Sequence, residues 1–109
     1  MTELMRLSKN AAMDELTKVL NRRAGKERLD LMLEQSRKEE RPLCVVLLDI
    51  NQLKTINDNY GHIEGDRLLK YVTCLAKESI GEEDMIFRLS GDEFVIAYYG
   101  EDILGTEDE

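Results

Sequence analysis

An uninterrupted apolar run that ends in an acidic residue places the strongest constraint on the fold of this chain. Residues 43–48 read Leu-Cys-Val-Val-Leu-Leu, and Asp49 follows directly. A short apolar run of this kind is typical of a central strand that is buried on both faces of a sheet. We therefore predict a strand over 43–48 that ends by presenting Asp49 at one edge of the sheet.

Helices and further strands are predicted on both sides of this run. Apolar residues at helical spacing indicate helices, and short apolar segments around a glycine turn indicate a hairpin. The expected elements are helices over 21–40, 52–60 and 63–79 and strands over 85–89 and 94–99. The buried stripes of the two longer helices are predicted at Leu29, Met32 and Leu33, and at Leu68, Val72, Leu75 and Ala76.

This order of elements predicts an α+β fold, with a central sheet of antiparallel or mixed strands flanked by helices as in an α/β sandwich. A ferredoxin-like or palm-like core has this arrangement of a strand, a helical connection and a hairpin. A complete unit of that type continues with a further helix and strands. We expect this 109-residue chain to lack them.

Charge and hydropathy exclude several classes of function. The net charge of −8 argues against a nucleic-acid-binding protein, which needs a basic face. No apolar run approaches the roughly 18 residues of a membrane span, and residues 1–4 (Met-Thr-Glu-Leu) do not resemble a signal peptide. We therefore expect a cytoplasmic protein without membrane contact.

Three carboxylates are predicted to meet at one end of the sheet. Asp49 ends the apolar strand, while Asp92 and Glu93 lie in the hairpin turn. If the two strands are neighbours, the carboxylates repel each other unless a cation lies between them, and Mg²⁺ or Mn²⁺ suits such oxygen ligands. The alternative is that Asp92 and Glu93 only satisfy turn geometry and that Asp49 caps a helix.

A second candidate group lies in residues 57–66, which read Asn-Asp-Asn-Tyr-Gly-His-Ile-Glu-Gly-Asp. The carboxylate of Asp66 could accept from N1–H and the 2-amino group of a guanine, and the amide of Asn57 could pair with the remaining polar atoms. The alternative is that both residues cap helices, since Asn and Asp are common caps.

Three linked motifs resemble the GGDEF family of diguanylate cyclases. Residues 14–23 are similar to its D-x-L-T-x-L-x-N-R-R opening, and residues 49–66 to its D-x-D-x-F-K-x-x-N-D-x-x-G-H-x-x-G-D segment. Residues 88–94, Arg-Leu-Ser-Gly-Asp-Glu-Phe, resemble R-x-G-G-D-E-F. The resemblance predicts a lead-in segment over 1–13, a partial domain of this family over 14–100 and an acidic tail over 101–109.

The resemblance implies an activity and its catalytic carboxylates. The family joins two GTP molecules into cyclic di-GMP, with one GTP held by each of two domains that face each other. By position, Asp49 and Asp92 would bind Mg²⁺ or Mn²⁺ with help from the carbonyl of Ile50. Glu93 would complete the acidic turn.

The resemblance also implies how the substrate would be held. Asn57 and Asp66 would recognise guanine, and backbone amides near Leu53 and Lys54 would meet the terminal phosphates. Gly91 would let the nucleotide approach the hairpin backbone closely.

Departures from the family pattern give further expectations. Ser90 replaces the first glycine of the signature, and Gly81 replaces the arginine of the inhibitory R-x-x-D motif, whose Asp84 is present. We therefore expect no strong product inhibition. Without its last strand the sheet would leave strand 43–48 at an open edge, which predicts a homodimer by edge pairing or strand exchange and weak activity. The alternative is a fragment of a longer protein with sensor domains, or a degenerate module that binds GTP or dimerises without turnover.

Overall fold

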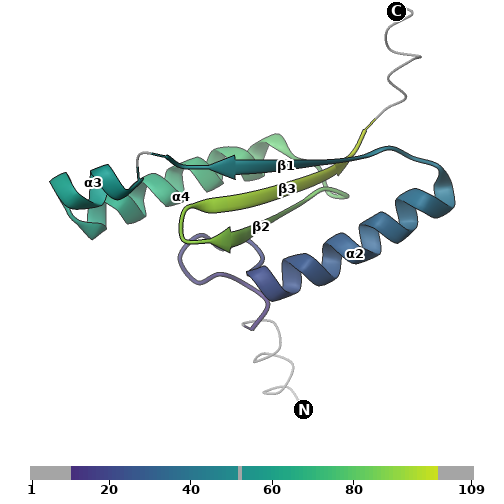
Figure 1. Ribbon diagram of the computed structural model, residues 1–109, viewed down its shortest axis with the longest axis horizontal. Coiled ribbons are helices and arrows are strands. Elements are labelled where there is room, and N and C mark those ends of the chain that lie inside the picture. Colours follow the sequence, from purple (N-terminus) through teal and green to yellow (C-terminus); the bar gives the residue numbers. More distant parts are fainter. Residues whose placement is uncertain (1–10, 52, 101–109) are drawn as a thin grey trace, which may run out of the picture.

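A computed structural model of the chain describes residues 11–51 and 53–100. The elements form a small α+β fold in which helices flank an antiparallel sheet, as the sequence predicts (Figure 1). They are α2 (Arg22–Glu39), β1 (Leu43–Asp49), α3 (Leu53–Tyr60), α4 (His62–Ser79), β2 (Met85–Ser90) and β3 (Glu93–Tyr99).

Local capping sets the bounds of the helices. The side chain of Asn21 accepts a hydrogen bond from the backbone N–H of Ala24 at 2.9 Å, which satisfies a free donor in the first turn of α2. Between α3 and α4 the backbone turns at Gly61, whose φ of 94° favours glycine. The predicted end of the short helix at residue 60 is confirmed.

The sheet has the strand order β1-β3-β2, and both pairings are antiparallel. The predicted central position of strand 43–48 is therefore wrong, because β1 lies at an edge of the sheet. Its middle residues are exposed, with Val45 at 52% and Leu47 at 58%. The expectation of an open edge at this strand agrees with the described residues, in which β3 is the only neighbour of β1.

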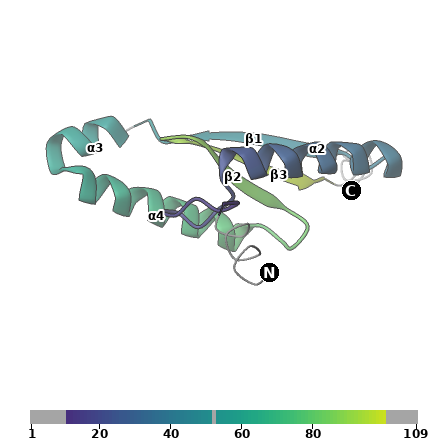
Figure 2. The same ribbon diagram turned by 90° about the horizontal axis from the view of Figure 1, so that it is seen from below.

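Alternation along the strands gives the sheet two apolar faces. Phe87 and Val95 pack with Met32 of α2, whereas Ile86 and Phe94 pack with Leu69 of α4. Figures 1 and 2 show α4 along one side of the sheet, with α3 projecting beyond the ends of the strands. The α3–α4 hairpin thus extends from the same end of the sheet at which β1 terminates.

Two of the predicted helical stripes are partly wrong. Met32 is buried and Leu29 packs against its cluster, but Leu33 is exposed because α2 covers the sheet with a narrower face. In α4 the buried positions are Gly65, Leu69 and Thr73. Leu68 and Ala76 of the predicted stripe pack against the core around Leu69, while Leu75 is exposed. The Thr73 hydroxyl donates to the carbonyl of Leu69 at 2.8 Å, which allows a polar residue to occupy the stripe.

The segment before α2 lies along the outer edge of β2. The backbone N–H of Arg88 donates to the carbonyl of Leu20 at 2.9 Å, and the N–H of Leu20 donates to the carbonyl of Ile86. This edge of the sheet is therefore partly covered, whereas no described segment covers the edge of β1. The part of the predicted lead-in segment before residue 11 lies outside the described residues. Among the described helices, none is long and apolar enough to cross a membrane.

Candidate functional site at the end of the sheet

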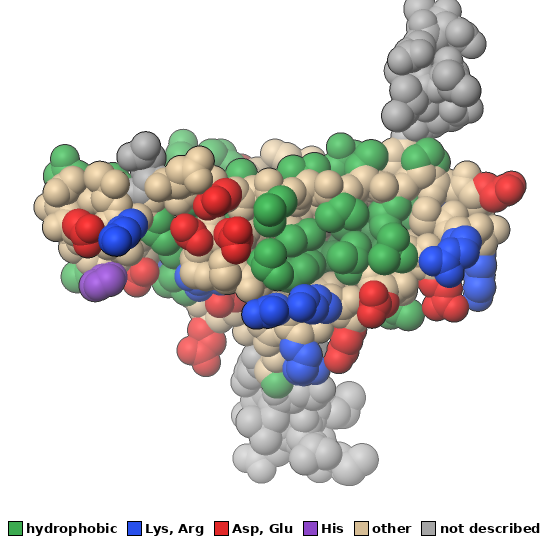
Figure 3. All heavy atoms as spheres, in the orientation of Figure 1, with side chains coloured by type: hydrophobic (Ala, Val, Ile, Leu, Met, Phe, Trp, Pro, Cys, Tyr) green, Lys and Arg blue, Asp and Glu red, His purple; other side chains and the backbone are tan. Residues whose placement is uncertain are grey.

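The antiparallel register brings the predicted acidic residues together. Asp49, the last residue of β1, is the direct cross-strand partner of Glu93, the first residue of β3. The backbone N–H of Ile50 donates to the carbonyl of Asp92 at 2.9 Å, so the end of β1 is joined to the hairpin turn. Figure 3 shows acidic side chains gathered beside the apolar face of the sheet. The expected meeting of the strand end with the signature turn is confirmed.

The signature forms a tight hairpin whose turn residues are Gly91 and Asp92. Ser90 and Glu93 are paired across it, after a register shift between Arg88 and Ser90. The hydroxyl of Ser90 donates to Oε1 of Glu93 at 2.7 Å. The serine that replaces the first signature glycine therefore contacts one of the predicted catalytic carboxylates directly.

Arg88 links this turn to the segment before α2. Its Nη2 donates to the carbonyl of Gly91 at 2.8 Å, and its Nη1 lies 3.2 Å from both carboxylate oxygens of Asp14. Asp14 also accepts from the backbone N–H and the hydroxyl of Thr17, at 2.9 and 2.6 Å. One guanidinium thus connects the turn at 14–17 with the hairpin.

These contacts change the acidity of Asp14. Partial burial acts to raise the pKa of its carboxyl, but hydrogen bonds from Thr17 and the charge of Arg88 outweigh that effect. The net result is a pKa below the ordinary value for an aspartate. The carboxylate is therefore stabilised in the charged form that pairs with Arg88.

The two predicted guanine-reading residues lie at the α3–α4 contact. A methyl group at Gly65 would stand 1.7 Å from Oδ1 of Asn57, so the absence of a side chain on α4 makes room for that amide. Oδ1 of Asn57 is buried without a hydrogen-bond partner in the described structure. Asp66 follows Gly65 directly and is exposed. A buried acceptor of this kind costs free energy unless a ligand or a water supplies a donor.

The start of α3 offers fewer free groups than the sequence suggests. Leu53 is only 8% exposed and its side chain belongs to the core shared with Phe94. Its backbone N–H donates to the carbonyl of Ile50 at 3.1 Å. Lys54 is exposed in the first turn of α3, where unpaired backbone N–H groups favour anions. Lys54 therefore remains the better candidate for a phosphate contact.

The donor set at the end of the sheet fits a divalent cation that arrives with phosphate groups. Asp49 and Glu93 supply carboxylates, and the carbonyl of Ile50 retains a second lone pair. Mg²⁺ is commonly held by one or two carboxylates, with substrate phosphates and waters as the other ligands. Within residues 11–51 and 53–100 no three acidic, cysteine or histidine side chains are grouped to hold a metal unaided.

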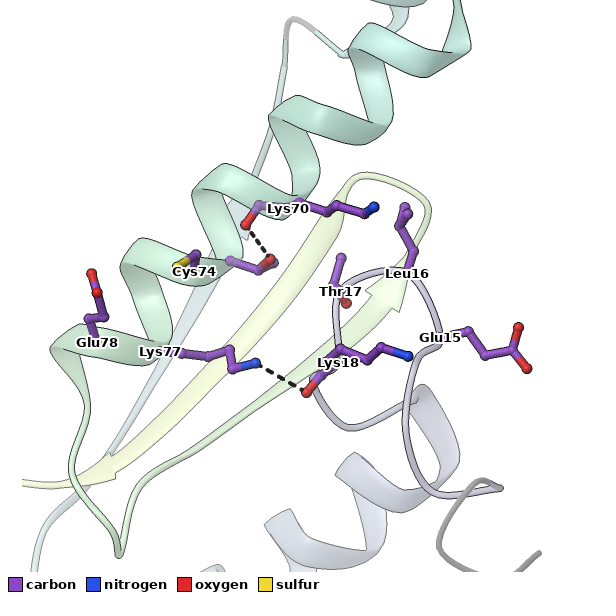
Figure 4. A pocket seen from close by; sticks show the side chains of 9 residues that line it. Glu15, Leu16, Thr17, Lys18, Lys70, Cys74, Lys77 and Glu78 are labelled. Carbon is purple, nitrogen blue, oxygen red and sulfur yellow. Dashed lines mark hydrogen bonds between the residues drawn. The ribbon is translucent and has the colours of Figure 1, made fainter.

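A cavity of about 710 Å³ lies elsewhere, between the 15–18 turn and α4. Figure 4 shows Lys18, Lys70 and Lys77 around it, with Nζ of Lys77 3.4 Å from the carbonyl of Lys18. Glu15 and Glu78 also line the cavity and offset much of the lysine charge. None of the predicted catalytic or guanine-reading residues is among those that line it.

The loop at the predicted inhibitory position closes on itself. The backbone N–H of Gly81 donates to Oδ2 of Asp84 at 2.7 Å. The carboxylate that an arginine would accompany in R-x-x-D is therefore engaged with its own loop. Weak product inhibition stays a prediction.

Sequence reasoning did not assign roles to Arg88, Asp14 or the hydroxyl of Ser90. Arg88 is part of the signature at 88–94 and Asp14 is the first residue of the motif at 14–23, so both belong to motifs that the sequence already shows. Their contact joins residues 74 positions apart, which no local pattern reveals.

Comparison with known proteins agrees with these motifs. Residues 11–102 match the family model described as "Diguanylate cyclase, GGDEF domain". The chain is 37% identical over 84 residues to the diguanylate cyclase DosC of Escherichia coli, covering 77% of this chain and 18% of DosC. It is 40% identical over 88 residues to the cyclic di-GMP phosphodiesterase PdeB of Shewanella oneidensis, covering 81% of this chain and 10% of PdeB. The chain thus spans about a fifth or less of the length of these relatives.

Solved structures show the same fold. A microbial GGDEF domain described in a novel interaction mode with cyclic di-GMP superposes with a TM-score of 0.82 at 34% identity, covering 94% of this chain and 65% of that one. The coiled coil and GGDEF domain of DgcB from Caulobacter crescentus, in complex with c-di-GMP, gives a TM-score of 0.88 at 26% identity, covering 96% and 55%. The chain belongs to the GGDEF diguanylate cyclase domain family.

Proposed function

We propose that this chain binds GTP together with Mg²⁺ or Mn²⁺ at the end of the sheet, and that two such domains join two GTP molecules into cyclic di-GMP. The observation that carries the proposal is the register that sets Asp49 opposite Glu93 beside the signature turn. GTP is a cytosolic nucleotide, so the proposed reaction takes place in the cytoplasm.

Asn57 and Asp66 would hold the guanine between α3 and α4. The buried Oδ1 of Asn57 lacks a donor in the described residues, and a guanine amine would supply one. Asp66 is exposed one residue beyond Gly65, so its carboxylate is free to accept from N1–H. Adenine has no N1–H, which makes this pair selective for guanine.

The triphosphate would extend from α3 toward the hairpin. Lys54 and the free backbone N–H groups of the first turn of α3 would hold the terminal phosphates. Asp49 and Asp92 would hold the divalent cation with the carbonyl of Ile50, and Glu93, the cross-strand partner of Asp49, would supply a further carboxylate oxygen. A bound cation would neutralise phosphate charge and polarise the α-phosphorus.

The reaction itself requires two domains. Each 3′-hydroxyl attacks the α-phosphorus of the opposite GTP, forms a new P–O bond and displaces pyrophosphate, and its proton is released. Gly91 has open space where a Cβ would lie, so the nucleotide has room to approach the turn. Two attacks close the ring and release two pyrophosphates.

Among the described residues β1 has no neighbour on its outer edge, which supports association with a second copy. Antiparallel pairing centred on Val46 would set Val45 opposite Leu47 of the other chain, which covers two exposed apolar side chains. Sedimentation velocity should therefore show a dimer that Val46→Lys converts to monomer, while Leu75→Lys on the exposed side of α4 has no effect. A wild-type monomer throughout would contradict edge pairing.

Binding and turnover are tested separately. We expect the purified chain to bind GTP more tightly in calorimetry when Mg²⁺ or Mn²⁺ is present than in EDTA, and chromatography of a GTP incubation to reveal cyclic di-GMP. Asp92→Ala should abolish product, whereas Asp30→Asn on the exposed face of α2 should change neither readout. Failure of the wild-type chain to bind GTP with either ion would refute the proposal.

The alternative is a domain of this family that binds GTP without turnover. The match to a relative named as a phosphodiesterase and the serine at position 90 favour this second candidate. It predicts GTP binding of the same guanine selectivity and no cyclic di-GMP.

A further inference from the structure

We propose that Ser90 is a positioning residue whose hydroxyl holds the carboxylate of Glu93 in place for the metal-bound nucleotide. This inference rests on the proposed function, because it concerns the same acidic turn. It assigns a role to the one signature position at which this chain departs from the family pattern.

The hairpin geometry fixes the pair. Ser90 and Glu93 are direct cross-strand partners on either side of a two-residue turn, so both side chains leave the same face of the sheet. Oγ of Ser90 lies 2.7 Å from Oε1 of Glu93, a normal length for a hydroxyl that donates to a carboxylate. Asp49 is the partner of Glu93 on the opposite side, in β1.

The backbone beneath this contact is held independently. Arg88 donates to the carbonyl of Gly91, and the N–H of Ile50 donates to the carbonyl of Asp92. Removal of the Ser90 hydroxyl should therefore leave the turn in place and change only the freedom of the Glu93 side chain. In the described structure the Ser90 hydroxyl is the sole hydrogen-bond donor to the Glu93 carboxylate.

The chemistry of the contact suits a positioning role. A glutamate side chain has several rotamers, and restricting them before a ligand binds reduces the entropy that binding must remove. The hydroxyl occupies one lone pair of Oε1 and leaves Oε2 free for a ligand. Glycine at this position would offer no such donor. The serine therefore adds a hydrogen bond that restricts the Glu93 carboxylate.

The experiment measures Mn²⁺ affinity in the presence of a GTP analogue with a methylene in place of the α–β bridging oxygen. Ser90→Ala and Ser90→Gly should each weaken Mn²⁺ binding about five-fold, the effect of one hydrogen bond. Ser90→Thr keeps the hydroxyl and should stay within about two-fold. Affinity for the analogue in EDTA should be the same in all four proteins, because guanine recognition does not involve position 90.

The same substitution in a Glu93→Ala chain distinguishes a positioning role of Ser90 from a general structural role. In a Glu93→Ala chain, Ser90→Ala should have no further effect on Mn²⁺ affinity, because the hydroxyl has lost its partner. Equal Mn²⁺ affinity of wild type, Ser90→Ala and Ser90→Gly overturns the role of Ser90 and leaves the proposed function intact. Equal losses in Mn²⁺ and EDTA also overturn it, since they indicate general disruption. Absence of Mn²⁺-dependent binding in the wild type overturns both proposals.

Discussion

The substitution Gly25→Ala tests how closely α2 packs on β2. A Cβ at position 25 would lie 2.0 Å from Cγ, 2.3 Å from Cβ and 2.4 Å from Cδ2 of Phe87. Phe87 is 2% exposed and its ring shares a core with Met32 and Val95, so it has no space into which to retreat. The helix must therefore move away from the strand by about 1 Å or more, which opens gaps along the contact.

The free energies decide the direction of the effect. Alanine in place of glycine inside a helix stabilises by about 1 kcal/mol, while overpacking of a close contact costs about 1–3 kcal/mol and occasionally more. Because the clash involves a buried ring, we expect a net loss of about 2 kcal/mol in unfolding free energy and a melting temperature lower by roughly 10 °C.

Urea unfolding followed by circular dichroism would measure this loss. Gly91→Ala is the matched control, because no heavy atom lies within 4 Å of a Cβ there, and it should change stability by less than about 0.5 kcal/mol. If Gly25→Ala unfolds at the same or a higher urea concentration than the wild type, the packing described for α2 and β2 is wrong.

Three further predictions concern Gly65, Lys18 and Asp14. Gly65→Ala would displace the short, movable amide of Asn57. We expect GTP binding in calorimetry to become about ten-fold weaker, while the unfolding free energy stays within about 1 kcal/mol of the wild-type value. Unaltered binding would contradict the role of Asn57. Lys18 has a φ of 61°, so Lys18→Gly should raise the unfolding free energy by about 1 kcal/mol, whereas an equal gain with Lys18→Ala would show that backbone strain is not the cause. Because the pKa of Asp14 is lowered on folding, its ion pair with Arg88 stabilises the fold fully above the ordinary aspartate pKa of about 3.9, and this stability is lost as the pH falls below that value. Urea titrations from pH 6 to 2 should therefore show a shallower decline of the unfolding free energy for Asp14→Asn than for the wild type. Identical slopes would refute the assignment.

The helices and the hairpin were predictable because their signals are local. Asn21 caps the start of α2, and Gly61 adopts the positive φ between α3 and α4. Both residue types are visible in the sequence. Burial was harder to predict, since it depends on what covers each face. The apolar run at 43–48 has the composition of a central strand, yet β1 has one described neighbour and α2 lies mainly against β2. Composition therefore indicated that the run is a strand but not where it lies in the sheet.

The candidate site likewise has some features that the sequence predicts and others that depend on tertiary packing. The convergence of Asp49 with Glu93 followed from one assumption, that the strand and the hairpin are neighbours, and the register confirms it. The place of Leu53 did not follow, because a residue at the start of a helix can expose its backbone while its side chain enters the core. The buried Oδ1 of Asn57 also depends on tertiary packing, since it arises from the approach of α3 to Gly65.

The contacts of Arg88 show that a sequence motif does not reveal which distant residues its side chains touch. Asp14 reaches Arg88 only because residues before α2 lie along β2, where the N–H of Arg88 donates to the carbonyl of Leu20. The same guanidinium then holds the carbonyl of Gly91 in the signature turn. The position of the turn therefore depends on two segments far apart in the chain, joined through one side chain. A substitution at Asp14 should consequently affect the hairpin as much as the turn in which that residue lies.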